Sequence, residues 1–212
     1  MEKSNYIELN PNEIEAKSFQ IITAEMGHLA MPEDKQAILK RVVHTTADFD
    51  YARITEIHPH AIQSAKAAIQ QSCSIYADTN MILAGVSKPS LKKFGCSIYT
   101  YVDHPEVAAQ SKELGITRSI LGINKAAEDP KTQIYVIGNA PTALVRLYEL
   151  IKEGRIHPAL IIGVPVGFVG ASESKELIKE TIVPYIVTNG RKGGSTVAVA
   201  ILNAILYQQQ CH

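Results

Sequence analysis

Short apolar runs alternate with segments of helical periodicity along most of the chain. The runs are rich in Ile, Val and Tyr and are bounded by Gly, Pro, Asn or Asp, which is typical of buried strands. We predict strands within residues 73–78, 96–102, 134–138, 159–163 and 185–188. Because helical segments separate these strands and several strands are apolar on both faces, the pattern predicts an α/β fold in three layers, α/β/α, with a mostly parallel sheet of about five strands.

Helical segments precede, separate and follow the strands. Asn10 suits the N-cap of the first helix, and Pro11 suits its first turn. Apolar residues spaced three and four apart predict helices at residues 10–26, 32–44, 58–71, 104–115, 117–129, 141–154, 172–180 and 193–207. No repeat, low-complexity stretch or long Gly/Ser linker divides the chain. We therefore expect one domain spanning residues 1–212, with its N-terminal helices packing over the sheet.

The composition is that of a soluble globular protein, with 46% hydrophobic and 20% charged residues. Lys plus Arg and Asp plus Glu number 21 each, so the net charge creates no field for nucleic acid or anionic lipid, and we expect neither partner. No apolar run approaches the roughly 18 residues of a membrane span. The first residues also lack the basic-then-apolar pattern of a signal peptide. The three cysteines lack CxxC spacing, which argues against a disulfide framework and a zinc site and favours the reducing cytoplasm.

Three loops that follow predicted strands combine small residues, amides and cations. In open parallel sheets, ligands bind beyond the carboxyl ends of the strands, where loops lead into helix N-termini. The first loop offers Asn139 and backbone N–H groups that favour a carboxylate or phosphate. In the second, glycines such as Gly163 let a ligand approach the backbone, and the third carries Arg191 and Lys192. Together the loops predict a broad anion-binding rim, although each alone is also typical of an ordinary turn.

His44 directly follows an apolar run at the predicted end of a helix. Such a histidine either compensates the helix dipole or carries proton-transfer chemistry near neutral pH, where imidazole ordinarily titrates. Asp48 and Asp50 are close enough in sequence to orient the imidazole, but they equally suit a cap of the next turn. These residues alone leave both interpretations open.

Other polar residues indicate ordinary structural roles. His58 and His60 have no nearby Cys and no HExxH spacing, so we expect no protein metal site. Ser18 lies on the first helix, where a hydroxyl is ordinarily exposed or bonded to its own backbone, and no GxSxG motif marks a nucleophile. Cys73 starts a predicted core strand, which favours a buried, inert thiol.

The order and spacing of several segments closely resemble one protein family. The most specific are "RVVHTTADFDYA", "IGNAPTALVRLYELI", "PALIIGVPVGFVGASESKELI" and "PYIVTNGRKGGSTVAVAILNAI". They resemble the precorrin-8X methylmutases, also called precorrin isomerases or cobalt-precorrin-8 methylmutases, over nearly the whole chain. This resemblance implies an α/β/α homodimer without a cofactor. It also implies an isomerase of cobalamin biosynthesis that moves a methyl group from carbon 11 to carbon 12 of precorrin-8X or cobalt-precorrin-8, giving hydrogenobyrinate or cobyrinate.

The resemblance also implies which residues form the site. The family's catalytic histidine corresponds to His44. The substrate-binding positions correspond to Ser18, Arg41, Asp78, Met81, Arg118, Asn139, Pro141, Thr142, Val169, Gly170, Gly190, Arg191, Lys192 and Gly193. The match is less close between residues 45 and 50, so the resemblance gives no role to Asp48 or Asp50.

A large macrocycle with acetate and propionate side chains needs an apolar slot rimmed by cations and backbone donors. Arg41, Arg118, Arg191 and Lys192 are the candidate carboxylate partners. A methyl shift within a conjugated ring needs the correct tautomer rather than a nucleophile or a redox centre. We hypothesise that His44 acts as a general acid and donates a proton to the ring, while the slot orients the substrate and excludes water.

Two other functions remain open. A non-catalytic tetrapyrrole carrier would use the same slot and bind the product without turnover. A nucleotide- or phosphometabolite-binding α/β enzyme would bind adenine nucleotides, but the chain contains neither a phosphate loop nor a dinucleotide fingerprint. Turnover of precorrin-8X distinguishes the isomerase from the carrier.

Overall fold

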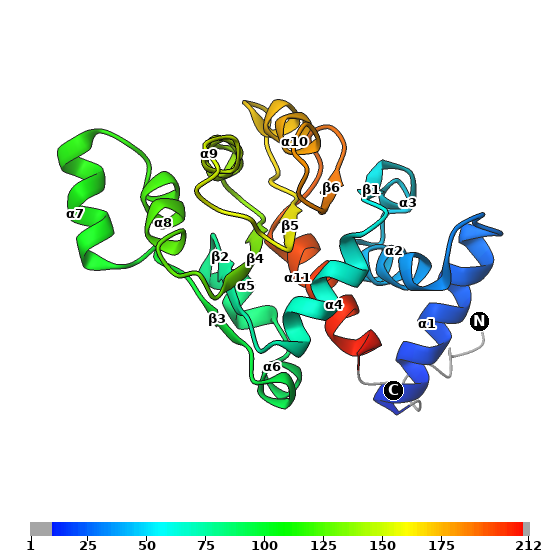
Figure 1. Ribbon diagram of the computed structural model, residues 1–212. Coiled ribbons are helices and arrows are strands. Elements are labelled where there is room, and N and C mark those ends of the chain that lie inside the picture. The colour runs from blue at the N-terminus through cyan, green and yellow to red at the C-terminus, as the bar shows by residue number, and fades with distance from the viewer. Residues whose placement is uncertain (1–9, 210–212) are drawn as a thin grey trace.

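A mixed sheet of six strands, in the order β1-β6-β5-β4-β2-β3, forms the centre of the molecule (Figure 1). The computed structural model describes residues 10–209. The strands are Thr55–Ile57 (β1), Ser74–Ala77 (β2), Ser97–Tyr99 (β3), Thr132–Ile137 (β4), Leu160–Gly163 (β5) and Tyr185–Thr188 (β6). The predicted strands are all confirmed and pair in parallel. β1 is additional and pairs antiparallel with β6, and its three residues are too few to show a periodic pattern.

The predicted helices are all present, with ends that differ by a few residues. The helices are Pro11–Met26 (α1), Glu33–Thr46 (α2), Tyr51–Ile54 (α3), Ala61–Gln70 (α4), Asn80–Gly85 (α5), Lys88–Phe94 (α6), Pro105–Leu114 (α7), Arg118–Ala126 (α8), Pro141–Lys152 (α9), Ala171–Lys179 (α10) and Ser195–Gln208 (α11). Asn10 caps α1 in a capping box with Glu13. The short helices α3, α5 and α6 were not predicted, because one or two turns carry too little periodicity. None of the helices within residues 10–209 is long and apolar enough to cross a membrane.

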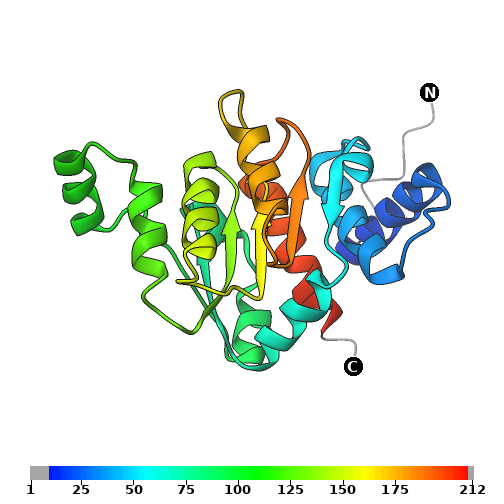
Figure 2. The same cartoon turned by 45° about the horizontal axis from the view of Figure 1, so that its top comes forward.

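The sheet separates two hydrophobic cores. Side chains of β4 alternate between them, so that Ile134 and Val136 face one core while Tyr135 and Ile137 face the other. The first core packs against α2, α4, α5 and α11, and the second packs against α8, α9 and α10. Figure 2 shows α9 and α10 in front of the sheet and α11 behind it. The three-layer α/β/α fold is therefore confirmed.

Two helices lie outside these layers. α1 packs on α2, which in turn packs on α11, and α7 packs on α8. Figures 1 and 2 show α1 and α7 at opposite ends of the molecule. Among the N-terminal helices, α1 and α2 thus reach the sheet through α11, whereas α4 packs directly on β4 and β5.

The strand order reverses between β2 and β4, since β3 lies on one side of β2 while β4, β5 and β6 extend on the other. Such a reversal opens a crevice at the carboxyl ends of the strands. Asp78 follows β2 at this point and is only 2% exposed. Its carboxylate accepts hydrogen bonds from the backbone N–H groups of Gly138, Asn139 and Ala140 at 2.8–2.9 Å. Asp78 therefore ties the loop after β4 to the end of β2.

Replacing Asp78 with alanine removes the acceptor of three N–H groups in a buried position. Because an unsatisfied buried donor costs about 1–3 kcal/mol, Asp78→Ala should lower the free energy of unfolding by about 3–5 kcal/mol. Urea unfolding followed by circular dichroism measures this change. The exposed Glu128 provides the control, and Glu128→Gln should stay within about 0.5 kcal/mol of the parent. An Asp78→Ala protein as stable as the parent would contradict this role.

Candidate functional site

The loops after β4, β5 and β6 pack on one another at the carboxyl edge of the sheet. The N–H of Gly194 donates to the carbonyl oxygen of Val164 at 2.8 Å. A Cβ on Gly193 would lie 2.1 Å from that oxygen, so this position requires glycine. Gly163 was predicted to approach a ligand, but that prediction is wrong: its Cβ position lies 3.1 Å from the side chain of Leu144 on α9. The glycine at that position serves helix-to-sheet packing.

The sequence predicted that the loop after β4 offers its first N–H groups to a ligand, but these groups are already engaged. The carboxylate of Asp78 already binds them, so an anion of the chain itself occupies this turn. Burial raises the pKa of Asp78, and the three N–H groups oppose that shift because they stabilise the charged form. Asn139 and Thr142 remain exposed on either side of Pro141, which begins α9. Side chains of this loop, rather than these backbone donors, therefore face the solvent.

A buried ammonium holds the loop after β6 from beneath. Lys175 on α10 has no exposed surface, and its Nζ donates to the carbonyl oxygens of Gly190 and Lys192 at 2.9 Å each. The third donor reaches Thr188 Oγ1 at 3.2 Å. Burial lowers the pKa of Lys175 to about 8, whereas three oxygen acceptors match the three N–H groups of the charged form. The interaction fixes the path of the loop on which Gly190, Arg191 and Lys192 lie.

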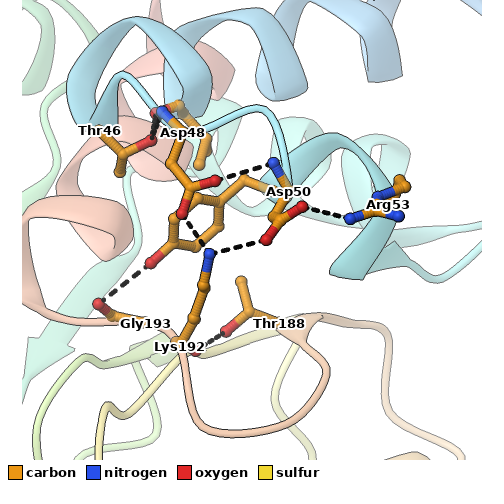
Figure 3. A network of polar contacts seen from close by, with 9 residues as sticks. Thr46, Asp48, Asp50, Arg53, Thr188, Lys192 and Gly193 are labelled. Carbon is orange, nitrogen blue, oxygen red and sulfur yellow. Dashed lines mark hydrogen bonds and ion pairs between the residues drawn. The ribbon is translucent and has the colours of Figure 1, made fainter.

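An ion-pair network joins the same loop to the segment after α2 (Figure 3). Lys192 Nζ lies between the carboxylates of Asp48 and Asp50, at 2.9 Å from Asp50 Oδ2. The hydroxyl of Tyr51 donates to the carbonyl oxygen of Gly193 at 3.4 Å. Hydrogen bonds from Lys192 lower the pKa of both aspartates, and these bonds raise the pKa of Lys192. The positive charge of Lys192 is thus balanced within the protein.

His44 lies exposed in the last turn of α2, four residues before Asp48. Because Asp48 holds Lys192, the network brings this end of α2 to the loop after β6. The imidazole ring stacks on Phe19 of α1, with ring centroids 5.0 Å apart and an interplanar angle of 16°. His44 therefore lies at the carboxyl edge of the sheet while also occupying the helix end that the sequence indicated.

A cavity of about 190 Å³ adjoins this end of α2. It lies between α2, α5 and α11, and Arg41 and Met81 line it together with Thr45 and Asn203. Met81 is 59% exposed at its mouth. Two positions implied by the resemblance are therefore brought together. A cation beside apolar side chains suits an apolar ligand that carries a carboxylate.

Arg118 and Thr142 lie at the starts of neighbouring helices. Thr142 Oγ1 is 3.2 Å from Oγ1 of Thr117, the N-cap of α8, and Arg118 follows as an exposed residue in the first turn. Ser18 differs, since its hydroxyl donates to the carbonyl oxygen of Ile14 at 2.9 Å, the self-bonded state that its helix position predicted. Its hydroxyl is therefore engaged with its own helix.

The loop after β5 presents apolar side chains beside a cation of the loop after β6. Phe168 and Val169 are 84% and 90% exposed. The guanidinium carbon of Arg191 lies 5.4 Å from the centroid of the Phe168 ring, within the range of a cation–π contact. Gly170 ends this loop with a positive φ of 75° and caps α10. Val169, Gly170 and Arg191 thus share one exposed surface at the site.

Several residues considered from the sequence lie apart from this site. The rings of His58 and His60 are 5.6 Å apart, and within residues 10–209 no group of three or more His, Cys, Asp or Glu side chains could hold a metal ion. Cys73 is buried, as predicted. Cys211 and residues 1–9, which also bear on the cysteine and signal-peptide predictions, lie outside the described residues.

The sequence and the fold of this chain are similar to those of known proteins. The model of the CbiC family, precorrin-8X methylmutase, matches residues 13–208. The chain belongs to the precorrin-8X methylmutase family. The cobalt-precorrin-8 methylmutase of Leptospira interrogans is 47% identical over 201 residues, which cover 91% of each chain. The precorrin-8X methylmutase of Pseudomonas aeruginosa is 37% identical over 196 residues, which cover 92% of this chain and 94% of that relative. The crystal structure of precorrin-8X methylmutase from Thermus thermophilus superposes with a TM-score of 0.86 at 38% identity, covering 92% of this chain and 95% of that one.

Family membership decides the class of function. This methylmutase is an enzyme, an isomerase of cobalamin biosynthesis, which the resemblance of the sequence predicted. The hypothesis of a nucleotide-binding α/β enzyme is thereby set aside. Two residues that hold the site together, Lys175 and Phe19, were missed by sequence reasoning. Lys175 could have been found, because it occupies the inward face of α10 four residues after the buried Ala171.

Titration of the lysine side chains tests the burial of Lys175. In protein labelled with ¹⁵N-lysine, NMR should give Lys175 Nζ a pKa near 8, because burial disfavours its charge. Lys192 should titrate above the ordinary lysine range, because two aspartates stabilise its charge. Lys175→Arg identifies the resonance by its disappearance. A Lys175 signal that titrates together with the exposed lysines would contradict the buried clamp.

Proposed function

We propose that this methylmutase moves the methyl group on carbon 11 of a tetrapyrrole ring to carbon 12. The substrate is cobalt-precorrin-8 or precorrin-8X, and the product is cobyrinate or hydrogenobyrinate. The family match over residues 13–208 carries this proposal. We favour the cobalt-containing substrate, because the relative at 47% identity is named for cobalt-precorrin-8, whereas the relative at 37% is named for precorrin-8X.

His44 is the proposed general acid. An intramolecular methyl shift needs no nucleophile from the protein, but protonation of the conjugated ring favours the electronic state from which the methyl group migrates. The imidazole is exposed at the end of α2, and the ion pair between Asp48 and Lys192 joins this end to the loop after β6, which supports access to a macrocycle bound at that edge of the sheet. After migration, loss of a proton from the ring would restore the acid. The loops contribute orientation and exclude water from the ring.

Three arginines are the proposed partners of the substrate carboxylates. Arg118 and Arg191 are exposed at the site. Arg41 lines the neighbouring cavity and pairs with Glu15 on α1 at 3.5 Å, so a substrate carboxylate would replace Glu15 there. Guanidinium groups suit bidentate pairing with acetate and propionate side chains. Asp78 and Lys192 have a different proposed role, since their charges are already paired with the chain. They shape the loops that carry Asn139, Pro141, Thr142 and Gly193.

Assembly and location are further parts of the proposal. We infer a homodimer in which the whole chain acts as one catalytic domain. Exposed apolar side chains on α1, Ile14 and Ile21, and the exposed Ile182 supply candidate contact surface. Biosynthesis from a labile tetrapyrrole intermediate supports a cytoplasmic location. Light scattering coupled to gel filtration gives the oligomeric state directly.

Turnover by a His44→Ala variant tests the proposed acid. Purified protein is mixed with cobalt-precorrin-8 and, separately, with precorrin-8X, and the visible absorption spectrum is followed over time. We expect conversion by the parent and a rate at least about 100-fold lower for His44→Ala, in line with the contribution of a general acid. Exposed His157, in the loop before β5 at the opposite edge of the sheet, provides the control, and His157→Ala should keep the parent rate.

The same assay separates the isomerase from a carrier. A carrier would give an immediate, stable spectral shift with both parent and variant and no time-dependent change. Near-parental turnover by His44→Ala would leave the isomerase intact but contradict the acid role of His44.

Removal of the Arg118 side chain should lower the affinity for substrate more than it lowers the rate of the chemical step. A charge-assisted hydrogen bond contributes about 1.5–3 kcal/mol, so Arg118→Ala should raise KM by roughly 10- to 100-fold with a smaller change in kcat. Arg155→Ala is the matched control, because Arg155 is exposed beyond the end of α9, away from the site. An unchanged KM for Arg118→Ala would exclude this arginine from carboxylate binding.

A further inference from the structure

The ring of Phe19 on α1 touches the two α2 side chains proposed for the site. It stacks on the imidazole of His44 with centroids 5.0 Å apart and planes inclined by 16°. The guanidinium carbon of Arg41 lies 5.3 Å from the Phe19 centroid and 4.8 Å from the centroid of Tyr207 on α11. His44 and Arg41 are three residues apart on α2 and therefore share one face of that helix. One phenyl ring thus contacts both.

The imidazole depends on this contact for its orientation. Within residues 10–209, the His44 side chain has no hydrogen-bond or ion-pair partner, and it is exposed. A histidine without such contacts rotates among rotamers, whereas a proton donor must be held within a narrow range of positions and angles. The nearly parallel Phe19 ring restricts the imidazole to one plane.

Side chains other than Phe19 join α1 to the core. Ile22, one turn further along α1, is buried in the core that covers one face of the sheet, and Met26 packs against that core. Phe19 is half-buried and is not part of that core in the described residues. Its ring instead borders a cavity of about 270 Å³ together with Arg41 and Tyr207. The stack on His44 therefore explains why a large aromatic side chain, Phe19, occupies this half-buried position beside the cavity.

We infer that Phe19 is a positioning residue that orients the imidazole of His44 for proton transfer. The inference rests on the proposed acid role of His44. A second aromatic ring, Tyr207, also contacts Arg41. Phe19 therefore touches both the acid and the cation, whereas the Tyr207 ring contacts the cation and not the His44 ring.

The test compares Phe19→Leu, which keeps apolar volume without a ring, with Phe19→Tyr, which keeps the ring. NMR of the His44 ring protons reports the stack, because a phenyl face shifts them upfield. We expect this shift in the parent and in Phe19→Tyr but not in Phe19→Leu. Single-turnover rates with cobalt-precorrin-8 should fall about 10- to 100-fold in Phe19→Leu and recover in Phe19→Tyr. Thermal unfolding checks that each variant is folded.

Two controls distinguish positioning from general damage. Tyr207→Leu should raise KM while leaving the single-turnover rate at saturation and the His44 resonances unchanged. Glu25→Ala, which alters an exposed residue of α1 outside the proposed contact surface, should change neither quantity. The inference is overturned if the His44 resonances are the same in the parent and Phe19→Leu, or if Phe19→Leu keeps the parent rate while His44→Ala is inactive. An active His44→Ala protein would instead overturn the proposed acid and with it the need for positioning.

Discussion

The site depends on three hydrogen bonds, which the Asp78 carboxylate accepts from consecutive backbone N–H groups. They lie where the strand order reverses, the place at which parallel sheets ordinarily bind ligands. The chain satisfies this turn with its own anion and so fixes the loop that leads into α9. Because Asp78 binds the backbone donors of this turn, the groups that face a ligand are the exposed side chains around it.

Buried charge recurs on the other side of the site. Lys175 pairs its ammonium with oxygens of the loop after β6, and Lys192 on that loop pairs with Asp48 and Asp50 after α2. The two lysines act on different surfaces of one loop, and together they join the C-terminal strand to the helix that carries His44. Charges paired within the chain, one of them buried, hold the loops in place, while Arg118 and Arg191 are exposed. This division is consistent with a balanced net charge in an enzyme whose proposed substrate is a polycarboxylate.

Much of the fold could be predicted because strands apolar on both faces and long periodic helices leave clear patterns. The three-residue edge strand β1 and the short helices α3, α5 and α6 could not be predicted, since their tertiary partners rather than their periodicity define them. For the site, the sequence identified the loops that meet at the carboxyl edge of the sheet and the place of His44 at the end of α2. It misjudged the free N–H groups after Gly138, because the acceptor, Asp78, lies 60 residues earlier in the chain. The stack of Phe19 on His44 likewise depends on how α1 packs on α2, which no local pattern reveals.

A crystal structure of the protein with its reaction product tests the central claim, that the carboxyl edge of the sheet binds the macrocycle beneath His44. The account predicts that the ring lies against the loops after β4, β5 and β6, with an imidazole nitrogen of His44 about 2.6–3.2 Å from it or linked to it through one water. Arg118 and Arg191 should pair with its carboxylates. A product bound at the opposite edge of the sheet, or at this edge with His44 turned away and out of reach, would contradict the account.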